Sequence, residues 1–295
     1  MRYRARRLVI ALVTVCVGSG FCQNRTAPAQ DAGRAERVMK ALSAAYPEAI
    51  GPAAYVDGDW AAPVRGKLFY YADGRLLPQE LRKNSADFDP APFYFSYPAE
   101  LPEWKEPDPE RARILRSSPP RRAVKRSSAF WDQLWDAHTE REARQNLQTL
   151  RFLGHNAIFH SMAADKLTLV GERIQAEATR SDEVRRWISS LDVVSVWYWR
   201  NVSQTQSRSF HAYGVAVDLL PASYRGETYW QWTAAKQIEF WAVPYEQRVH
   251  PPQAVIKAFE AYGFIWGGKW FLYDTMHFEY RPETFILNNI PYQRH

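Results

Sequence analysis

A histidine and an aspartate stand seven residues apart in the segment SFHAYGVAVD, residues 209–218. The Tyr-Gly pair at 213–214 can turn the chain, and residues 215–219 then alternate as a strand, so that Asp218 can point back toward His211. An imidazole and a carboxylate that meet across a turn are a typical pair of metal ligands. The spacing therefore indicates the first half of a metal site.

A second segment, WGGKWFLYDTMHFE at residues 266–279, carries the other half. Asp274 precedes His277 by three residues, and the chain then alternates again as a strand. Two imidazoles and one carboxylate leave a fourth position open, as in catalytic zinc sites, and a nearby carboxylate can take a proton from water. We predict that His211, Asp218 and His277 bind one zinc ion per chain and that Asp274 is the general base.

The two motifs together read Ser-x-His-x-x-Gly-x-Ala-x-Asp, then Gly-Gly-x-Trp and Asp-x-x-His-Phe-Glu. They resemble the VanY-type zinc D-Ala-D-Ala carboxypeptidase and L-Ala-D-Glu endopeptidase family, which has the hedgehog/DD-peptidase fold. Either motif alone is weak, but the set is specific. The resemblance implies an α+β fold, with a small antiparallel sheet flanked by helices, and a peptidoglycan stem peptide as substrate.

The sequence does not decide which of the family's two peptide bonds this protein would cut. By resemblance, Trp-Gly-Gly-x-Trp with His-Phe-Glu favours the endopeptidase branch. Lys269 points the other way, because it replaces an acidic residue common in the family, and a lysine that met the substrate would prefer a carboxylate to an amine.

Arg200 precedes the first motif by nine residues. The resemblance implies that this arginine polarises the scissile carbonyl or holds a substrate carboxylate. The family more often shows Gly-Tyr-Arg there, whereas this chain reads Tyr198-Trp199-Arg200, and a surface salt bridge is the alternative.

Residues that flank the ligands are expected to complete the site. Glu279 shares a strand face with His277, so we expect it to be a hydrogen-bond partner of that ligand rather than a ligand itself. Ser209 bonds either substrate or His211. The residues expected to bind substrate are Ser209, Tyr213, Trp266 and Trp270. The histidines outside the motifs are interpreted as surface or core residues, with His160 the one placed to approach the site: His138, His155, His160, His250 and His295.

The chain has 295 residues, 46% hydrophobic and 15% aromatic, which is enough for a substantial core. Its net charge of +6 depends on five arginines that precede Gln30, and from Gln30 onwards the charge is only +1. This near balance argues against a nucleic-acid partner.

The first residues have the pattern of an export signal. A basic stretch, residues 1–7, precedes an apolar run, residues 8–17, that is too short to span a bilayer, and Ala27-Pro28-Ala29 is a candidate cleavage site. We therefore expect a periplasmic or cell-envelope protein. Both cysteines lie here, so the mature chain would contain no disulfide, and membrane attachment would require lipidation of Cys22, which the bulky Phe21 disfavours.

Three regions are expected: a signal peptide at 1–29, a β-rich N-terminal extension at 30–120, and the zinc peptidase domain at 121–295. The extension should contain a helix at 31–46, a hairpin turning at Asp73-Gly74 and a proline-rich strap at 90–109. In the peptidase domain we expect helices at 130–150, 163–174, from Ser181 and from Pro251 to Gly263, and strands at 156–160 and 193–199. The aromatic residues of 223–250 line either a substrate groove or the core.

A rival to hydrolysis is a cell-wall-binding protein that contains zinc without turnover. Asp274 argues against it, because a protein that only binds needs no proton acceptor beside the metal.

Overall fold

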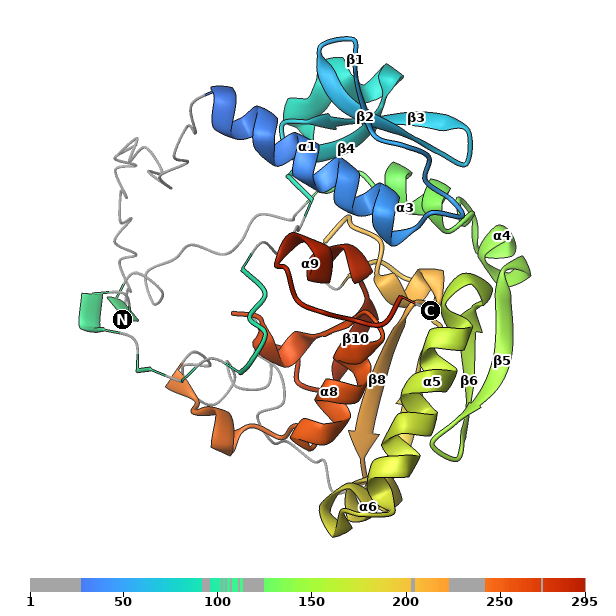
Figure 1. Cartoon of the computed structure of the whole chain (residues 1–295), viewed down its shortest axis with the longest axis vertical. Helices are drawn as coiled ribbons and strands as arrows, with labels where there is room; N and C mark the ends of the chain where they lie inside the picture. The colour runs from blue at the N-terminus through green and yellow to red at the C-terminus, as the bar shows by residue number, and fades with distance from the viewer. Residues whose placement is uncertain are drawn as a thin grey trace, which may run out of the picture.

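The computed structural model describes residues 28–91, 96–101, 103, 105–106, 108–110, 112–113, 125–202, 205–222, 242–271 and 273–294 (Figure 1). Residues 1–27 of the expected signal segment and residues 223–241 of the aromatic segment lie outside these ranges, as does His295, whereas Pro28 and Ala29 belong to the first helix. Among the residues that the structure describes, no helix combines the length and apolar character needed to cross a membrane.

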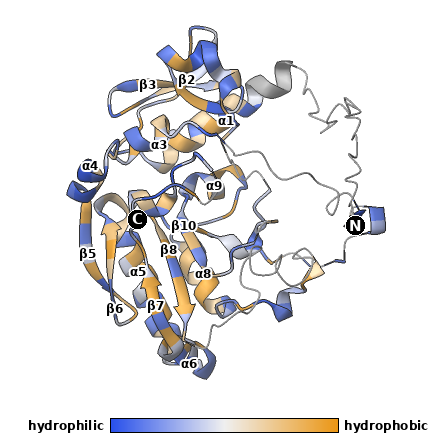
Figure 2. Cartoon of the chain, turned by 180° about the vertical axis from the view of Figure 1, so that it is seen from behind, coloured by the Kyte–Doolittle hydropathy of each residue, from blue (hydrophilic) through white to orange (hydrophobic). Residues whose placement is uncertain are grey.

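The centre of the molecule is a four-stranded antiparallel sheet in the order β7-β8-β10-β9. Its strands are β7 (Leu191–Ser195), β8 (Ala216–Pro221), β10 (His277–Tyr280) and β9 (Phe264–Trp266). The two inner strands, β8 and β10, come from the two sequence motifs. Figure 2 shows β8 as predominantly hydrophobic, in keeping with its place inside the fold.

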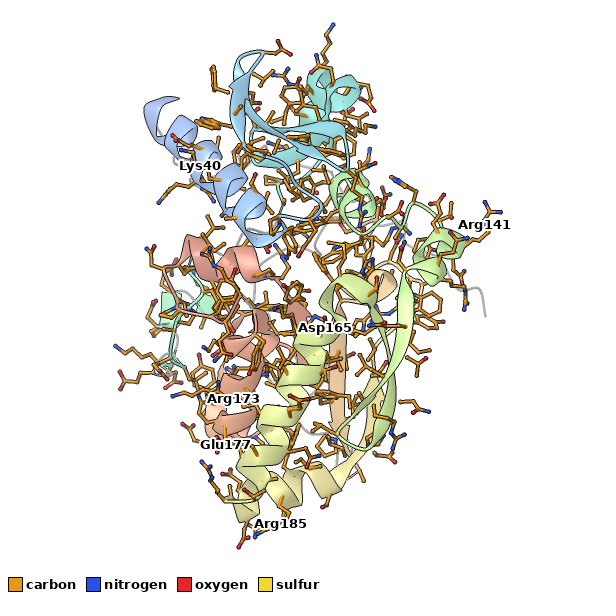
Figure 3. The ribbon with its side chains drawn as sticks, turned by 45° about the vertical axis from the view of Figure 1, so that its right-hand side comes forward. Lys40, Arg141, Asp165, Arg173, Glu177 and Arg185 are labelled. Carbon is orange, nitrogen blue, oxygen red and sulfur yellow. The ribbon has the colours of Figure 1, made fainter. Side chains whose placement is uncertain are left out.

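Helices and a hairpin pack around this sheet. They are α5 (Ser161–Ala178), α6 (Asp182–Ser190), α8 (Gln253–Ala261) and the hairpin of β5 (Leu147–Phe152) and β6 (His155–His160). On α5, Leu167, Val170 and Ile174 are buried, while Asp165 lies on the solvent side, as Figure 3 shows. The spacing of these three residues, by three and then four positions, places them on one face of the helix.

The expected helix at 130–150 is wrong. The chain forms two short helices instead, α3 (Ala129–Leu134) and α4 (Glu140–Gln145), and then strand β5. A capping box between Thr139 and Glu142 starts α4 as a separate helix. Leu153 and Gly154, both with positive φ, form the two-residue turn between β5 and β6.

Other expected elements are present with shifted ends. Ser181 caps α6 by accepting a hydrogen bond from the Val184 N–H group, and Gly263 follows α8 with a positive φ. Strand β7 ends at Ser195, four residues before the expected end of the 193–199 strand. The next carbonyl, that of Val196, hydrogen-bonds a histidine instead of a neighbouring strand.

The N-terminal part contains α1 (Pro28–Ala45) and a second antiparallel sheet. This sheet is the meander β1 (Ala54–Val56), β2 (Asp59–Val64), β3 (Lys67–Ala72) and β4 (Arg75–Pro78), followed by the 3-10 helix η1 (Gln79–Asp87). The predicted turn is confirmed, since Asp73 and Gly74 link β3 to β4 with positive φ at both positions.

The N-terminal part packs directly on the rest of the protein. Helix α1 lies beside α9 (Pro282–Leu287), as Figure 1 shows, and the Arg65 side chain donates to the Leu134 carbonyl at 3.0 Å. The Tyr46 ring meets the Trp135 ring edge-on at 5.5 Å. Buried residues of both parts belong to one core, so the α+β molecule is held together across the expected boundary at 120.

Gly214 provides a test of the turn that precedes β8. Its φ is +70°, and a Cβ there would lie 2.5 Å from the Leu147 side chain and 3.2 Å from the His160 backbone nitrogen. Gly66 also has a positive φ, of +83°, but nothing lies within 4 Å of its Cβ position. We expect Gly66→Ala to lower the free energy of unfolding by about 1 kcal/mol through backbone strain alone, and Gly214→Ala to lower it further. Urea unfolding measures both, and equal losses would contradict the predicted crowding at Gly214.

Candidate metal centre

Strand pairing brings the second and third predicted ligands together. In the antiparallel β8–β10 pair, His277 stands directly opposite Asp218. Side chains at opposed positions of such a pair emerge on the same face, with Cβ atoms about 5 Å apart. The register of two strands therefore places a carboxylate against an imidazole.

The first ligand comes from the 3-10 helix η2 (Phe210–Tyr213), immediately before β8. The Ser209 hydroxyl caps this helix by accepting from the His211 N–H group at 3.3 Å, so of its two expected partners the structure shows His211. Gly214 then ends η2 in the left-handed conformation. Capping at both ends fixes the direction in which His211 leaves the backbone.

The three side chains present one ligand atom each to a common point. The His211 Nε2 atom lies 3.2 Å from Asp218 Oδ2 and 3.3 Å from His277 Nδ1, and His277 Nδ1 lies 2.9 Å from Asp218 Oδ1. In a tetrahedral zinc site with bonds of about 2.0–2.1 Å, ligand atoms are roughly 3.3 Å apart. The donor set and its spacing fit a zinc ion, and all three ligand atoms lie within 4.8 Å of one another.

Hydrogen bonds on the outer sides of the two rings select the nitrogens that face inward. His211 Nδ1 donates to the Val196 carbonyl at 2.6 Å, which leaves Nε2 free as an acceptor. His277 Nε2 lies 3.3 Å from Glu279 Oε2, which leaves Nδ1 facing Asp218. Such outer partners orient metal-binding histidines, as expected for Glu279.

Without a cation, the group is held by charge pairing. Burial opposes ionisation of Asp218, but His211 and His277 together lower its pKa well below the usual range. Burial disfavours the charged form of His277, yet hydrogen bonds to Asp218 and Glu279 raise its pKa well above the usual value. A proton on His277 would therefore compete with a metal ion for this side chain.

Asp274 sits on the turn that leads into β10. Its N–H group donates to the Gly267 carbonyl at 3.0 Å, and a Cβ at Gly267 would lie only 2.5 Å from the Asp274 carbonyl oxygen. Position 267 therefore requires glycine for this close approach. The Asp274 Oδ1 atom is buried and has no hydrogen-bond partner among the described residues.

The environment of Asp274 suits a proton acceptor. Burial raises the pKa of its carboxyl to about 7, an effect that the positive charges of His277, His211 and Arg200 partly offset. A base with a pKa near the working pH is the most effective. An unpaired carboxylate oxygen beside three convergent ligands is what a proton-accepting role requires.

Arg200 lies on the exposed segment that follows β7. Its backbone carbonyl accepts from Ser209 at 3.1 Å, which holds this segment against the start of the first motif. Its charge is near enough to lower the pKa of Asp274. Arg200 is therefore solvent-exposed and within electrostatic reach of Asp274.

Two of the residues expected to contact substrate are buried instead. Tyr213 is 1% exposed, and its hydroxyl donates to Asp132 at 2.8 Å. Trp266 is 2% exposed, and its indole N–H donates to the Thr275 carbonyl at 2.8 Å. Neither position fits direct contact with substrate. Both side chains support the backbone that carries the ligands and Asp274.

Lys269 lies away from solvent, so the condition on which it bore on the choice of peptide bond, contact with substrate, is not met in the structure. Its side chain is 0% exposed and forms a 2.6 Å ion pair with Glu260, while donating to the carbonyls of Pro98 and Ala99. These contacts fasten the described part of the proline-rich strap to α8. Trp270, by contrast, is half-buried with its ring 5.5 Å from the His277 ring, at the edge of the centre.

His160 does not belong to the ligand group. It caps α5 through Nδ1, its Nε2 atom lies 3.0 Å from the Trp135 carbonyl, and burial lowers its pKa to about 4. Residues that the sequence interpretation missed include Val196, whose carbonyl orients His211, and Arg281 and Glu283, which continue from Glu279. Charged residues at every second position from 277 to 283 were a usable signal for the last two.

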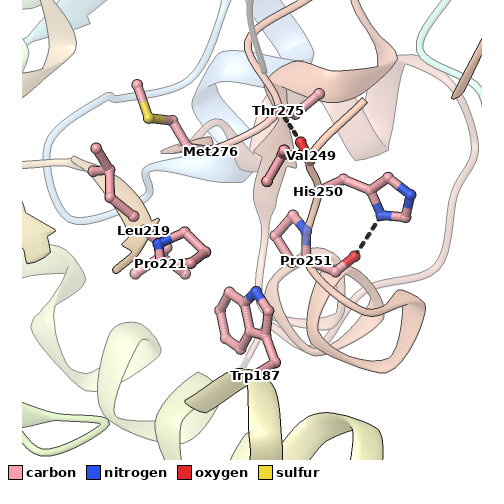
Figure 4. Close-up of a pocket in the computed structure, with 9 residues that line it drawn as sticks. Trp187, Leu219, Pro221, Val249, His250, Pro251, Thr275 and Met276 are labelled. Atoms are coloured by element: carbon pink, nitrogen blue, oxygen red, sulfur yellow. Dashed lines mark hydrogen bonds between the residues drawn. The ribbon is translucent and has the colours of Figure 1, made fainter. Parts of the chain in front are cut away.

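An apolar pocket lies nearby but contains none of the three ligands (Figure 4). Leu219 and Met276 line it, and as strand neighbours of Asp218 and His277 they face away from the ligands. The other lining residues are Trp187, Leu220, Pro221, Val249, His250, Pro251 and Thr275. None of the described residues that line this pocket has a carboxylate, so the pocket lacks the donor set of the candidate centre.

The α+β fold brings two imidazoles and a carboxylate together beside a buried carboxyl, a donor set that could hold a metal ion. Residues 203–280 match a peptidase family model described as D-alanyl-D-alanine carboxypeptidase. This region contains the three ligands and Asp274, and it supports a peptidase of the M15, VanY-like kind in general. It is narrower than the expected 121–295 and does not reach Arg200.

The N-terminal part has a separate match. Residues 38–93, from within α1 to beyond η1, match a domain of unknown function. No curated protein and no solved structure matches the chain.

The raised pKa of Asp274 predicts a pH effect on the metal-free protein. The folded chain holds this proton up to about pH 7, whereas an unfolded aspartate loses it near ~3.9. The stability that this group contributes is therefore complete below about pH 4 and is lost as the pH rises through about 7. Asp274→Asn should lose less stability than wild type across this interval, by on the order of 1 kcal/mol or more.

Urea unfolding in chelator between these pH values measures the difference. Asp165→Asn, on the outward side of α5, is the matched control and should follow the wild type. Parallel curves for wild type and Asp274→Asn would contradict a buried, protonated carboxyl at position 274.

Proposed function

We propose that this protein is an exported zinc peptidase that removes the terminal D-alanine from peptidoglycan stem peptides. The observation that supports it most is the convergence of His211, Asp218 and His277 beside the unpaired Asp274 carboxylate. The family match over 203–280 supports the carboxypeptidase reaction, and the alternative cleavage between L-Ala and D-Glu is an outcome of the test below.

A zinc ion held by these three ligands supplies a Lewis acid and lowers the pKa of water to about 7. Asp274 accepts the proton of the attacking water and delivers it to the departing amine. His211 and His277 stay neutral while coordinating, because the Val196 carbonyl and Glu279 hold their outer nitrogens. With two neutral imidazoles, the single negative charge of Asp218 would only partly neutralise a divalent zinc ion, so the centre would keep a positive charge.

The exposed residues around the centre receive the substrate. Arg200 holds the terminal carboxylate or polarises the scissile carbonyl, since its guanidinium is solvent-accessible and electrostatically coupled to Asp274. Trp270 forms one side of the entrance beside His277. Lys269 takes no part, because Glu260 and two backbone carbonyls already occupy its ammonium group.

The cellular location follows from the N-terminal pattern. A basic stretch followed by a short apolar run suits export to the periplasm or cell envelope, where peptidoglycan is found. Attachment to a membrane would depend on lipidation of Cys22.

Metal analysis of the purified protein, followed by mass spectrometry of digested muropeptides with and without chelator, tests the function. We expect one zinc ion per chain and a chelator-sensitive loss of terminal D-alanine. Release of fragments cut after L-Ala would make the enzyme an endopeptidase. Zinc without cleavage would indicate a wall-binding protein, and no zinc would overturn the proposed centre.

Asp274→Asn isolates the role of the base. It keeps the size of the side chain but removes the proton acceptor, so we expect kcat to fall by about 10²–10⁴-fold while the zinc content stays at one per chain. Asp274→Glu restores a carboxylate and should recover part of the activity. Unchanged hydrolysis in Asp274→Asn would show that another group takes the proton.

A further inference from the structure

A chain of buried polar contacts leads away from the candidate metal centre. Glu279, which holds the His277 ring, accepts from Arg281 Nη1 at 3.2 Å, and the Arg281 Nε atom donates to Glu283 Oε1. Glu283 Oε2 in turn accepts from the Tyr46 hydroxyl at 2.8 Å. A ligand in β10 is thus connected to a tyrosine next to the end of α1.

Every member of this chain is shielded from water. The side chains of Arg281 and Glu283 are 0% exposed, that of Glu279 is 6% exposed, and Tyr46 is 2% exposed. In such a medium a charged group depends on its protein partners, and removing one partner leaves the next without compensation. The four groups therefore hold their positions jointly.

Aromatic rings fix the chain from the sides. The Arg281 guanidinium carbon lies 4.8 Å from the centre of the Trp131 ring and 4.9 Å from that of Phe210. Tyr46 packs edge-on against Trp135 and Tyr280. These contacts hold the Tyr46 hydroxyl at Glu283 and the Arg281 guanidinium between Glu279 and Glu283.

We propose that Tyr46 is a positioning residue for the metal centre, acting through Glu283, Arg281 and Glu279 on the orientation of His277. The N-terminal part, which matches a domain of unknown function, would thereby help to orient a ligand that it does not contact. The inference rests on the proposed zinc function. It assigns to the N-terminal part a role in metal binding and turnover in addition to stability.

Tyr46→Phe removes only the hydroxyl that holds Glu283. Loss of an outer hydrogen-bond partner commonly weakens metal binding by about 10–100-fold, and we expect a loss of about tenfold here because Tyr46 acts through intermediates. The absorption spectrum of the cobalt-substituted protein should change, and kcat should fall with KM unchanged. Zinc affinity is measured by competition with a chelator.

Tyr70→Phe is the matched control. Tyr70 is as buried as Tyr46, and its hydroxyl also donates to a carboxylate of the N-terminal part, Asp57, at 3.1 Å. Among the described contacts, nothing connects the Tyr70–Asp57 pair to the ligands, so the zinc affinity, cobalt spectrum and kcat of Tyr70→Phe should match the wild type. Melting temperatures of both variants separate a loss of stability from a loss of positioning.

Wild-type zinc affinity and cobalt spectrum in Tyr46→Phe, even with a lowered melting temperature, would overturn the inference. If Tyr46→Phe does not fold, Glu283→Gln provides the same measurements, because it keeps the shape and weakens the bond to Arg281. Failure of the proposed function would instead appear in the wild type, as absent zinc or absent cleavage. Absent zinc would overturn the inference as well, whereas zinc without cleavage leaves its affinity and spectral measurements decisive.

Discussion

The pairing of one buried carboxylate with two imidazoles is the constraint on which the rest of the centre depends. Asp218 can stay ionised inside the protein only because His211 and His277 face it, and His277 does so only in one register of β8 and β10. A slip of one residue would move His277 to the opposite face. Val217 and Phe278, fully buried on that face, resist the slip, and Phe278 stacks on Phe259 at 3.9 Å. The buried apolar side chains of β8 and β10 thus fix the register that places His277 opposite Asp218.

The convergence of His211, Asp218 and His277 could be predicted because the signals for it are local. A turn followed by alternation determines on which side Asp218 emerges, and His277 obeys the same rule on its own strand. Much of the fold followed from equally local signals, such as the Asp73-Gly74 turn and the Ser181 cap. The error at 130–150 was also local, because the capping box at Thr139 and the Leu153-Gly154 turn, both visible in the sequence, indicate separate elements instead of one helix.

What the sequence did not reveal depends on partners far along the chain. Tyr213 and Trp266 adjoin the ligands, but each has a distant partner. The Tyr213 hydroxyl donates to Asp132, and the Trp266 backbone N–H donates to the hydroxyl of the strap residue Tyr97 at 2.8 Å. Lys269 looked available because Glu260 is nine residues away on another element. Sequence periodicity and spacing do not predict such contacts, because they form only in the tertiary fold.

The hydrogen bond between Tyr46 and Glu283 joins residues 237 positions apart, and this separation sets an order of events. A chain synthesised from its N-terminus completes α1 long before β10 and α9 exist. The apolar side of α1, with Val38 and Leu42, can then pack on β2 but still lacks α9, its other main partner. Closing so long a loop comes late in folding. The centre therefore assembles only after the whole chain is present, and a partly made protein has no finished hydrolytic site.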